Sequence, residues 1–541
     1  MRQWMVAAKK ADFYAIAEKF HVDPVVARII RNREVIGEKN IRIYLGGNLS
    51  DLSDPHQMKD MDRLVEILAQ KIRKQVHIRI IGDYDVDGVT SSHLFLTALR
   101  RVGAKVDVVI PHRIQDGYGL SLHLLQQAKE DGVDTILTCD NGIAAIDEIA
   151  WAKAQKMTVL VTDHHAVPFE EHEGRRTEKK SLADAVVNPH QQDCGYPYKE
   201  LCGAGVAWNV IRVLYENYDM DKREAEDLLD FVAMATVCDV MSLTGENRIL
   251  VKEGLKRIRH TKNIGLQALM QACNVQPENI SAYHFGYVLG PCVNATGRLD
   301  TARHALRLFE TGQETEAEEI ARDLVDLNQE RKELTLQGVE MAKKLCEEGG
   351  YENDPILVLF LPDVHESIAG LIAGRIREMY NRPVFVLTRG EEGVKGSGRS
   401  TENYSMYENM CGCVELFTKF GGHPMAAGLS LPEENVEKFR RKINENCPLT
   451  VEEVCPDIHI DMAMPVGYAS TELVHQFALL EPFGKDNPSP LFADRNLSIS
   501  RMWLIGKNRN VLRMSVLSEY GQPVPLSLIH ISEPTRLALI S

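Results

Sequence analysis

The stretch VHIRIIGDYDVDG, residues 76–88, decides the fold of this chain. Its first six residues, 76–81, are rich in β-branched side chains and predict a strand. The following loop, 82–88, holds three aspartates between two glycines, and a helical pattern runs over 89–101. A strand, a polar loop and a helix in this order form the repeating unit of an α/β domain.

The same unit recurs along the next hundred residues. Strand patterns cover 105–110, 134–139 and 157–162, and each is followed by a polar loop. Strands that alternate with helices predict a parallel, doubly wound sheet. Ligands of such sheets bind at the carboxyl ends of the strands, so these loops are the candidate site.

Acidic residues and histidines gather in those loops. They are Asp83, Asp85 and Asp87 after the first strand, Asp140 after the third, Asp163, His164 and His165 after the fourth, and Asp239 in a later helical segment. Each aspartate alone could be a helix N-cap. Together they repel one another unless a cation neutralises them. Carboxylates with one or two imidazoles suit Mn²⁺ or Mg²⁺ better than zinc.

The rest of the chain divides by pattern. We expect an N-terminal helical region, the first α/β domain, a helical connector, a second α/β domain, an incomplete β-barrel (OB-like, as the family resemblance given below implies) and a non-native tail, at 1–70, 71–250, 251–350, 351–455, 456–525 and 526–541. A charged insert at 170–181 is expected to be a mobile loop.

The tail is interpreted as foreign sequence. Residues 526–536 read LSLIHISEPTR, which resembles the translation of a transposase-type sequencing adapter. Such segments are excluded from fold reasoning. We therefore expect the natural protein to continue beyond Pro525.

Composition limits the class of protein. The chain has 541 residues, of which 44% are hydrophobic and 26% charged, as in ordinary globular proteins. It lacks a run of eighteen apolar residues and has only a short apolar start, which argues against a membrane span or a signal peptide. Eleven scattered cysteines predict reduced thiols and a cytoplasmic protein. The net charge of −15 excludes a generally basic nucleic-acid coat but permits a local basic groove.

Two pairs of motifs carry a family resemblance. The aspartate-rich loop 82–88 together with Asp163-His164-His165 resembles the DHH phosphoesterase superfamily. The segments GSGRS at 396–400 and GGHPMAAG at 421–428 resemble its DHHA1 substrate-binding domain. The first motif and the domain order are similar to those of the superfamily's single-strand-specific 5′→3′ exonucleases, which act in DNA recombination and repair.

The resemblance implies two ions, Mn²⁺ or Mg²⁺, and a role for each residue. Asp140 would bridge the ions, His165 would contact the phosphate, and Asp163 would orient the histidines from the second shell. Asp83 is left open as a ligand or a supporting partner. The implied metal ligands are Asp83, Asp85, Asp87, Asp140, His164 and Asp239, and the catalytic residues are Asp140, His164 and His165.

The resemblance also implies a pocket for a terminal 5′-phosphate. Ser397, Arg399 and Arg113 would form it, Arg298 would touch the backbone, and His423 would lie at the scissile or the adjacent phosphate. The glycines of 396–400 are expected to let backbone N–H groups approach an anion. The alternatives are an ordinary glycine hairpin at 396–400 and a tight turn with a capping histidine at 421–423. His365 could contact substrate or cap a helix.

Three functions remain in view. The first is a single-strand exonuclease; the second is another DHH enzyme that hydrolyses oligonucleotides or cyclic dinucleotides; the third is a non-catalytic scaffold. The first implies single-stranded DNA as substrate, a single-strand-binding protein and a RecQ-type helicase as partners, a monomer and no membrane attachment.

Overall fold

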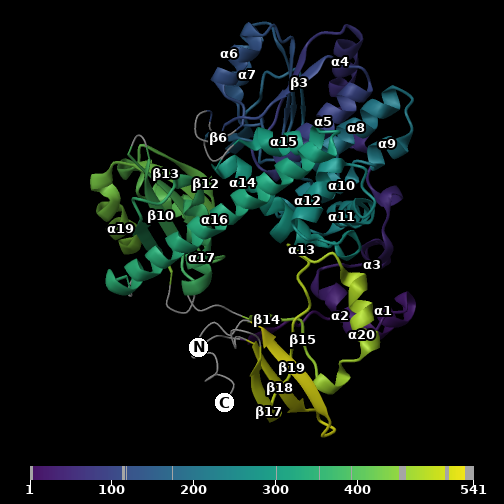
Figure 1. Cartoon of the computed structure of the whole chain (residues 1–541), viewed down its shortest axis with the longest axis vertical. Coiled ribbons are helices and arrows are strands. Elements are labelled where there is room, and N and C mark those ends of the chain that lie inside the picture. The colour runs from purple at the N-terminus through teal and green to yellow at the C-terminus, as the bar shows by residue number, and fades with distance from the viewer. Residues whose placement is uncertain are drawn as a thin grey trace. The chain divides into compact units, whose positions relative to one another are not determined.

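The computed structural model describes residues 4–112, 116, 119–172, 175–299, 301–351, 354–390, 393–449, 458–505 and 511–529. Its contacts divide the chain into two units. The larger unit spans 48–456, and the smaller combines 1–47 with 457–541. Figure 1 labels many of the helices and strands of both units.

The larger unit begins with a five-stranded parallel sheet. The strand order is β3-β2-β4-β5-β8, and every neighbouring pair runs parallel. The strands are β2 (Ile78–Ile81), β3 (Val106–Val109), β4 (Thr135–Cys139), β5 (Thr158–Thr162) and β8 (Ala185–Val187). The strand order changes direction at β2, as in doubly wound folds. The predicted sheet is confirmed.

Helices cover both faces of this sheet. Ile80 belongs to a core that also holds residues of α4 (Met61–Arg73), α5 (Val86–Arg101), α8 (Gly203–Asn217) and α10 (Leu229–Cys238). The next residue, Ile81, belongs to the opposite core, beneath α6 (Leu122–Glu130) and α7 (Ile146–Ala154). Side chains alternate across a strand, so a sheet buried on both faces reads as a continuous apolar run.

A helical region joins the two sheets of the larger unit. It contains α11 (Gly245–Ile258), α12 (Ile264–Ala272), α14 (Gly290–Leu299), α15 (Ala302–Glu310) and the 35-residue α16 (Glu314–Glu348). The first half of α16 contributes to the core of the first domain through Leu324. Its second half packs on α17 (Glu366–Tyr380), where Val339 joins the core of the second domain. One helix therefore takes part in both cores.

The second sheet is mixed. Its order is β12-β13-β11-β10-β9, and only the β9–β10 pair is parallel. Its strands are β9 (Leu357–Phe360), β10 (Val384–Gly390), β11 (Gly393–Arg399), β12 (Lys419–His423) and β13 (Ala426–Leu431). The prediction of a second α/β domain rested on the strand–helix–strand pattern of β9, α17 and β10. The antiparallel strands β11, β12 and β13 come after this pattern in the chain.

The smaller unit brings the two ends of the chain together. Strand β1 (Trp4–Val6) pairs in parallel with β14 (Ile458–Ile460). Helices α1 (Phe13–Phe20), α2 (Pro24–Asn32) and α3 (Glu38–Gly46) share a core with α20 (Thr471–Phe477). Arg33 binds the buried Asp461 with two hydrogen bonds of 2.7 and 3.1 Å. The helical region expected over 1–70 is thus shared between the two units.

The C-terminal strands form an open sheet. Strands β17 (Ser498–Ile505), β18 (Val511–Leu517) and β19 (Pro523–Ile529) pair antiparallel in that order. They make no closed barrel within the described residues, in keeping with the incomplete OB-like domain that we predicted. The last four residues of β19 belong to the segment interpreted as foreign.

Two further findings concern the expectations. The charged insert contains a hairpin of β6 (Phe169–His172) and β7 (Arg175–Glu178), which are joined by four backbone pairs. The sequence analysis did not predict these strands, and the mobility of the segment stays a prediction. No helix in the described part of the chain is long and apolar enough to cross a membrane.

Candidate metal centre and phosphate cavity

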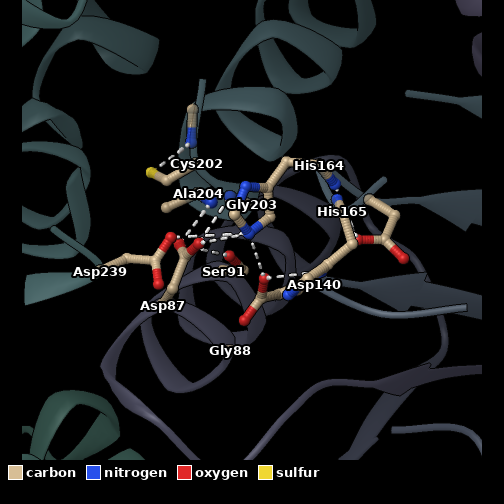
Figure 2. Close-up of polar contacts among 12 residues, drawn as sticks. Asp87, Gly88, Ser91, Asp140, His164, His165, Cys202, Gly203, Ala204 and Asp239 are labelled. Carbon is tan, nitrogen blue, oxygen red and sulfur yellow. Dashed lines mark hydrogen bonds and ion pairs between the residues drawn. The ribbon is translucent and has the colours of Figure 1, made fainter. Parts of the chain in front are cut away.

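The carboxyl edge of the parallel sheet gathers the predicted acidic residues. Asp83 and Asp140 follow β2 and β4, and His164 follows β5; all three are buried. Asp239 arrives from another direction, as the C-cap of α10. Figure 2 shows Asp87, Asp140 and Asp239 around the imidazole of His164.

The imidazole of His164 contacts three carboxylates of the cluster. Its Nε2 lies 3.1 Å from Asp140 Oδ1 and 3.6 Å from both Asp87 Oδ2 and Asp239 Oδ2. Three sets of side chains can offer ligand atoms within 4.8 Å of one another: Asp140 with His164 and His165, Asp87 with His164 and Asp239, and Asp83 with Asp85 and Asp140. Asp140 and His164 each belong to two of these sets.

The electrostatics of the cluster fit divalent cations. Burial raises the pKa of Asp83 and Asp140 well above the ordinary range, and neighbouring aspartates raise each further. Burial and then Asp87 raise the pKa of Asp85. Among the described residues, Asp83 Oδ1 and His164 Nε2 have no hydrogen-bond partner. Cations would satisfy both atoms and remove the repulsion.

Asp87 is held by a helix terminus that the sequence analysis missed. Its carboxylate accepts hydrogen bonds from the backbone N–H groups of Gly203 and Ala204, at 2.6 and 2.7 Å. These are the first residues of α8, where free N–H groups and the helix dipole favour an anion. The signal was the run of small residues 203–205 just before an apolar helix pattern.

Two positions at this site, Asp140 and Gly203, have special backbone requirements. Asp140 has φ 61°, a left-handed conformation that Asn and Asp adopt more readily than other side chains. A Cβ atom on Gly203 would come within 2.7 Å of Asp140 Cβ. Glycine at 203 therefore lets α8 approach Asp140 and Asp87 together.

Asp163 organises the histidine loop from behind. Its Oδ1 accepts from the backbone N–H groups of His164 and His165, at 2.7 and 3.0 Å, and Oδ2 accepts from Ile143 at 2.9 Å. Its Oδ1 also lies 2.8 Å from His165 Nδ1. Burial opposes ionisation of Asp163, but His165 and His164 outweigh it and lower the pKa of Asp163.

The contact with Asp163 also raises the pKa of His165. Burial lowers the pKa of His165, and Asp163 more than compensates, so that this pKa rises to about 9. Burial instead lowers the pKa of His164, against the attraction of Asp87. His165 is 39% exposed, while His164 is buried. The two environments therefore favour opposite forms, the protonated form of His165 and the neutral form of His164.

A second polar site lies on a face of the mixed sheet. A cavity of about 420 Å³ is lined by Ser397 and by Tyr84 of the aspartate-rich loop. Both domains of the larger unit thus form its wall. Lys395, Lys419 and Thr388 also line it; none of the three was predicted, because lysines and threonines on strands are common.

Strand alternation explains the GSGRS segment. In β11, Lys395, Ser397 and Arg399 share one face, and Gly396 and Gly398 share the other. A Cβ on Gly396 would meet Leu387 at 2.4 Å, and one on Gly398 would meet Met406 at 2.6 Å. β11 pairs with strands on both sides, so its N–H groups serve the sheet. The expectation that these glycines expose N–H groups to an anion was wrong.

Arg399 and Arg298 converge on the start of α17. A Cβ on Gly370 would lie 2.8 Å from Arg399 Nη2, so the guanidinium rests on this helix. Arg399 Nη1 also donates to the carbonyl oxygen of Gly398 at 2.7 Å. Arg298 comes from α14, and its Nη1 donates to the carbonyl oxygen of Ser367 at 2.7 Å.

The remaining predicted residues fall elsewhere. His423 is exposed at the end of β12 and does not line the cavity, whereas Gly421 does. His365 is the N-cap of α17, and its side chain accepts from Ser367 N. Arg113 lies outside the described residues.

Helix α14 supports the aspartate-rich loop. Asn294 Oδ1 accepts a hydrogen bond from Val86 N at 3.2 Å. A Cβ on Gly297 would come within 2.4 Å of the Tyr84 carbonyl oxygen. The segment around Arg298 therefore holds the aspartate-rich loop in place and also directs Arg298 toward α17.

Comparisons with known proteins agree with this architecture. Three family models match: the DHH family N-terminal domain over 77–236, the DHHA1 domain over 353–447 and the RecJ OB domain over 460–528. The single-stranded-DNA-specific exonuclease RecJ of Haemophilus influenzae is 34% identical over 534 residues, with 95% of this chain and 90% of that protein covered. The chain belongs to the RecJ family.

Other RecJ proteins extend the comparison. RecJ of Bacillus subtilis is 33% identical over 512 residues, which are 94% of this chain but 63% of that protein. The structure of Thermus thermophilus RecJ in complex with Mn²⁺ matches with a TM-score of 0.80 at 26% identity, covering 98% of this chain and 79% of that one. A structure of exonuclease RecJ bound to manganese matches with a TM-score of 0.63 at 31% identity, covering 73% and 96%.

Proposed function

We propose that this protein is a metal-dependent exonuclease that degrades single-stranded DNA from the 5′ end to mononucleotides. The observation that carries the proposal is the pair of adjoining ligand sets that share Asp140, set beside a cavity lined by both domains. The relatives that match most of the chain are named single-stranded-DNA-specific exonucleases.

The metal ligands proposed are Asp83, Asp85, Asp87, Asp140, His164 and Asp239. Two divalent cations, Mn²⁺ or Mg²⁺, would supply Lewis acidity toward the phosphodiester and an attacking water. The α8 terminus fixes the direction of the Asp87 carboxylate. The neutral His164 offers a lone pair, as a metal ligand must.

His165 takes a different role. Its Nδ1 contacts Asp163, so Nε2 is the ring atom that would donate to a phosphate oxygen. With its pKa raised to about 9, His165 carries a proton at neutral pH. We assign it to hold the scissile phosphate and to stabilise charge as the bond to the leaving oxygen breaks.

The second domain would select the end of the strand. Arg399 can hold a terminal phosphate with two N–H groups, and Ser397 can add a hydroxyl donor. Arg113 and His423 are proposed to complete the phosphate contacts, and Arg298 to touch the backbone. A 5′-phosphate held there leaves the first phosphodiester at the metal centre, which gives 5′→3′ polarity.

A time course on strands labelled at either end tests the proposal. Purified protein should release 5′-labelled mononucleotides from single strands with Mn²⁺, and EDTA should stop the reaction. Blunt duplexes should resist. Release of 3′ label first, equal cutting of duplex, or preference for a cyclic dinucleotide would overturn it. Binding without any hydrolysis would point to a scaffold.

The remaining part of the proposal rests on family likeness. We propose a cytoplasmic monomer that works in recombination and repair with a single-strand-binding protein and a RecQ-type helicase. Sedimentation of the purified protein would test the monomer. Acceleration of digestion by each partner on coated or duplex DNA would test the partnerships.

A further inference from the structure

Two exposed tyrosines stack on a helical segment that packs against the end of α10. Tyr283 and Tyr287 are 62% and 71% exposed. Their ring centroids lie 5.1 Å apart, with an angle of 25° between the ring planes. Aromatic rings of this size are normally at least partly buried, and such a stacked, solvent-facing pair offers a broad apolar face.

The local backbone creates the pair. Tyr283 lies in the short helix α13 (Ala282–His284), and Tyr287 lies in the π-helical turn η4 (Phe285–Leu289). Side chains four positions apart lie on the same face of a helix, so the two rings can meet. π turns are rare and are frequently found at functional sites.

Neighbouring contacts hold Tyr283 in place. Its ring meets the His284 ring edge-on, with centroids 5.7 Å apart and an interplanar angle of 87°. His284 Nδ1 is itself fixed by Ser281, at 2.9 Å from Oγ and 3.2 Å from the backbone N. The ring is therefore positioned before any ligand arrives.

The π turn packs on the end of α10 that carries Asp239. Cys238 Sγ donates to the Phe285 carbonyl oxygen at 3.3 Å. A Cβ on Gly290 would lie 2.3 Å from Cys238 Sγ, so glycine permits this close approach. Asp239 is the next residue, and the exposed Val240 follows it.

The same helical run continues to the substrate side of the site. After η4 it becomes α14, which holds the aspartate-rich loop through Asn294 and contacts α17 through Arg298. The tyrosine pair thus lies on the same helical run as the residues that contact the aspartate-rich loop and α17.

We propose that Tyr283 and Tyr287 form a stacking platform for the bases of the single strand that extends from the metal site. This inference rests on the proposed function and adds a base-binding site to it. Stacking accepts all four bases, as a nuclease without sequence preference requires, because every base has a π-face. Phosphate contacts alone would hold the backbone and leave the bases free to move.

Variants of the two tyrosines test the platform. The double variant Tyr283→Ala/Tyr287→Ala should raise KM for a long single strand by roughly tenfold or more, since base stacking is a substantial share of strand binding. Its kcat should stay close to that of the unchanged protein. Tyr283→Phe/Tyr287→Phe keeps both rings and should restore KM. Tyr14→Ala removes an equally exposed tyrosine of α1 as a matched control.

Abasic strands show whether the bases are the ligand. A short run of abasic sugars, moved stepwise from the 5′ end, should raise KM of the unchanged protein at one set of positions. The alanine double variant should be insensitive at those positions. An unchanged KM for the alanine variant, or equal sensitivity of both proteins, would overturn the platform. Absence of cleavage by the unchanged protein would instead overturn the proposed function.

Discussion

The two sheets of the larger unit present polar groups in different ways. The parallel sheet gathers Asp83, Asp140 and His164 at its edge, because every strand ends on the same side. The mixed sheet places Lys395, Ser397 and Arg399 on one face of β11, because alternate side chains point the same way. The edge of the parallel sheet therefore brings together residues from segments that are distant in sequence. The face of the mixed sheet presents alternate residues of a single strand.

The difference also separates chemistry from binding. The edge of the parallel sheet is buried and acidic. Its aspartates repel one another when they are charged, and bound cations would relieve this repulsion. The face opens to a cavity lined by Lys395, which is paired with Glu366, and by Lys419, and we propose that it binds phosphate without an ion. Variants at the edge should therefore affect kcat, whereas variants on the face should affect recognition of the strand end.

The largest effect is expected at Asp140. Asp140→Asn keeps a side chain that tolerates the φ of 61° but weakens the bridge between the two ligand sets. Lewis acid assistance contributes several kcal/mol, so kcat should fall by roughly a thousandfold or more. Single-turnover rates with Mn²⁺ would measure this. The melting temperature of the metal-free protein should not fall, and turnover near normal would refute the bridging role.

A smaller loss should follow Gly203→Ala. The added methyl would press on Asp140 and shift the α8 terminus that holds Asp87. A displacement of about 1 Å at a catalytic group costs roughly a hundredfold in rate, and overpacking costs about 1–3 kcal/mol of stability. Gly374→Ala is the matched control, because nothing lies within 4 Å of a Cβ there. Equal behaviour of the two variants would show that α8 does not position the centre.

Arg399→Ala should act on the other sheet and change recognition rather than chemistry. Loss of charge-assisted hydrogen bonds of about 1.5–3 kcal/mol should reduce the preference for a 5′-phosphorylated end by roughly tenfold to a hundredfold. The ratio of kcat/KM on phosphorylated and hydroxyl-ended strands measures it. Arg389→Ala removes an exposed arginine paired with Glu433 and should leave the ratio unchanged. A proportionate loss on both ends would place Arg399 in the chemical step.

The smallest effect concerns Asp230, a buried acid outside the cluster. It accepts from Thr261 Oγ1 at 2.6 Å and from Phe231 N at 2.8 Å, yet burial raises the pKa of Asp230 to about 6. The unfolded chain loses this proton near pH 4 and the folded chain near pH 6. The free energy of unfolding contributed by this group therefore falls between pH 4 and pH 6 and stays lower above.

Asp230→Asn removes that loss. The variant should be more stable than the unchanged protein at pH 7 by about 1–3 kcal/mol, and the gap should close below pH 4. Urea unfolding at the two pH values measures both quantities. A gap of the same size at pH 4 and pH 7 would show that ionisation of Asp230 is not its cause.

The sequence predicted the acidic edge of the parallel sheet better than the polar face of the mixed sheet. Alternating strands and helices impose a parallel sheet, and a parallel sheet brings Asp83, Asp140 and His164 to one edge whatever the details of packing. The face depended on strand register: GSGRS did not reveal that its glycines meet Leu387 and Met406 across the core. Register is set by partners far along the chain, so a local pattern does not contain it.

The sequence by itself determined the parallel α/β domain, the acidic and histidine loops at its strand ends and the family to which the chain belongs. Only the tertiary structure decided that the α8 terminus holds Asp87, that residues 1–47 fold with the C-terminal segment, and that Tyr283 and Tyr287 stack in solvent on a turn that contacts Cys238. The sheet and its loops follow from periodicity within about twenty residues, and the family follows from the resemblance of short motifs. The features that the tertiary structure decided depend on contacts between segments that are distant in sequence, or on a helical turn that residue patterns do not distinguish from an α-helix.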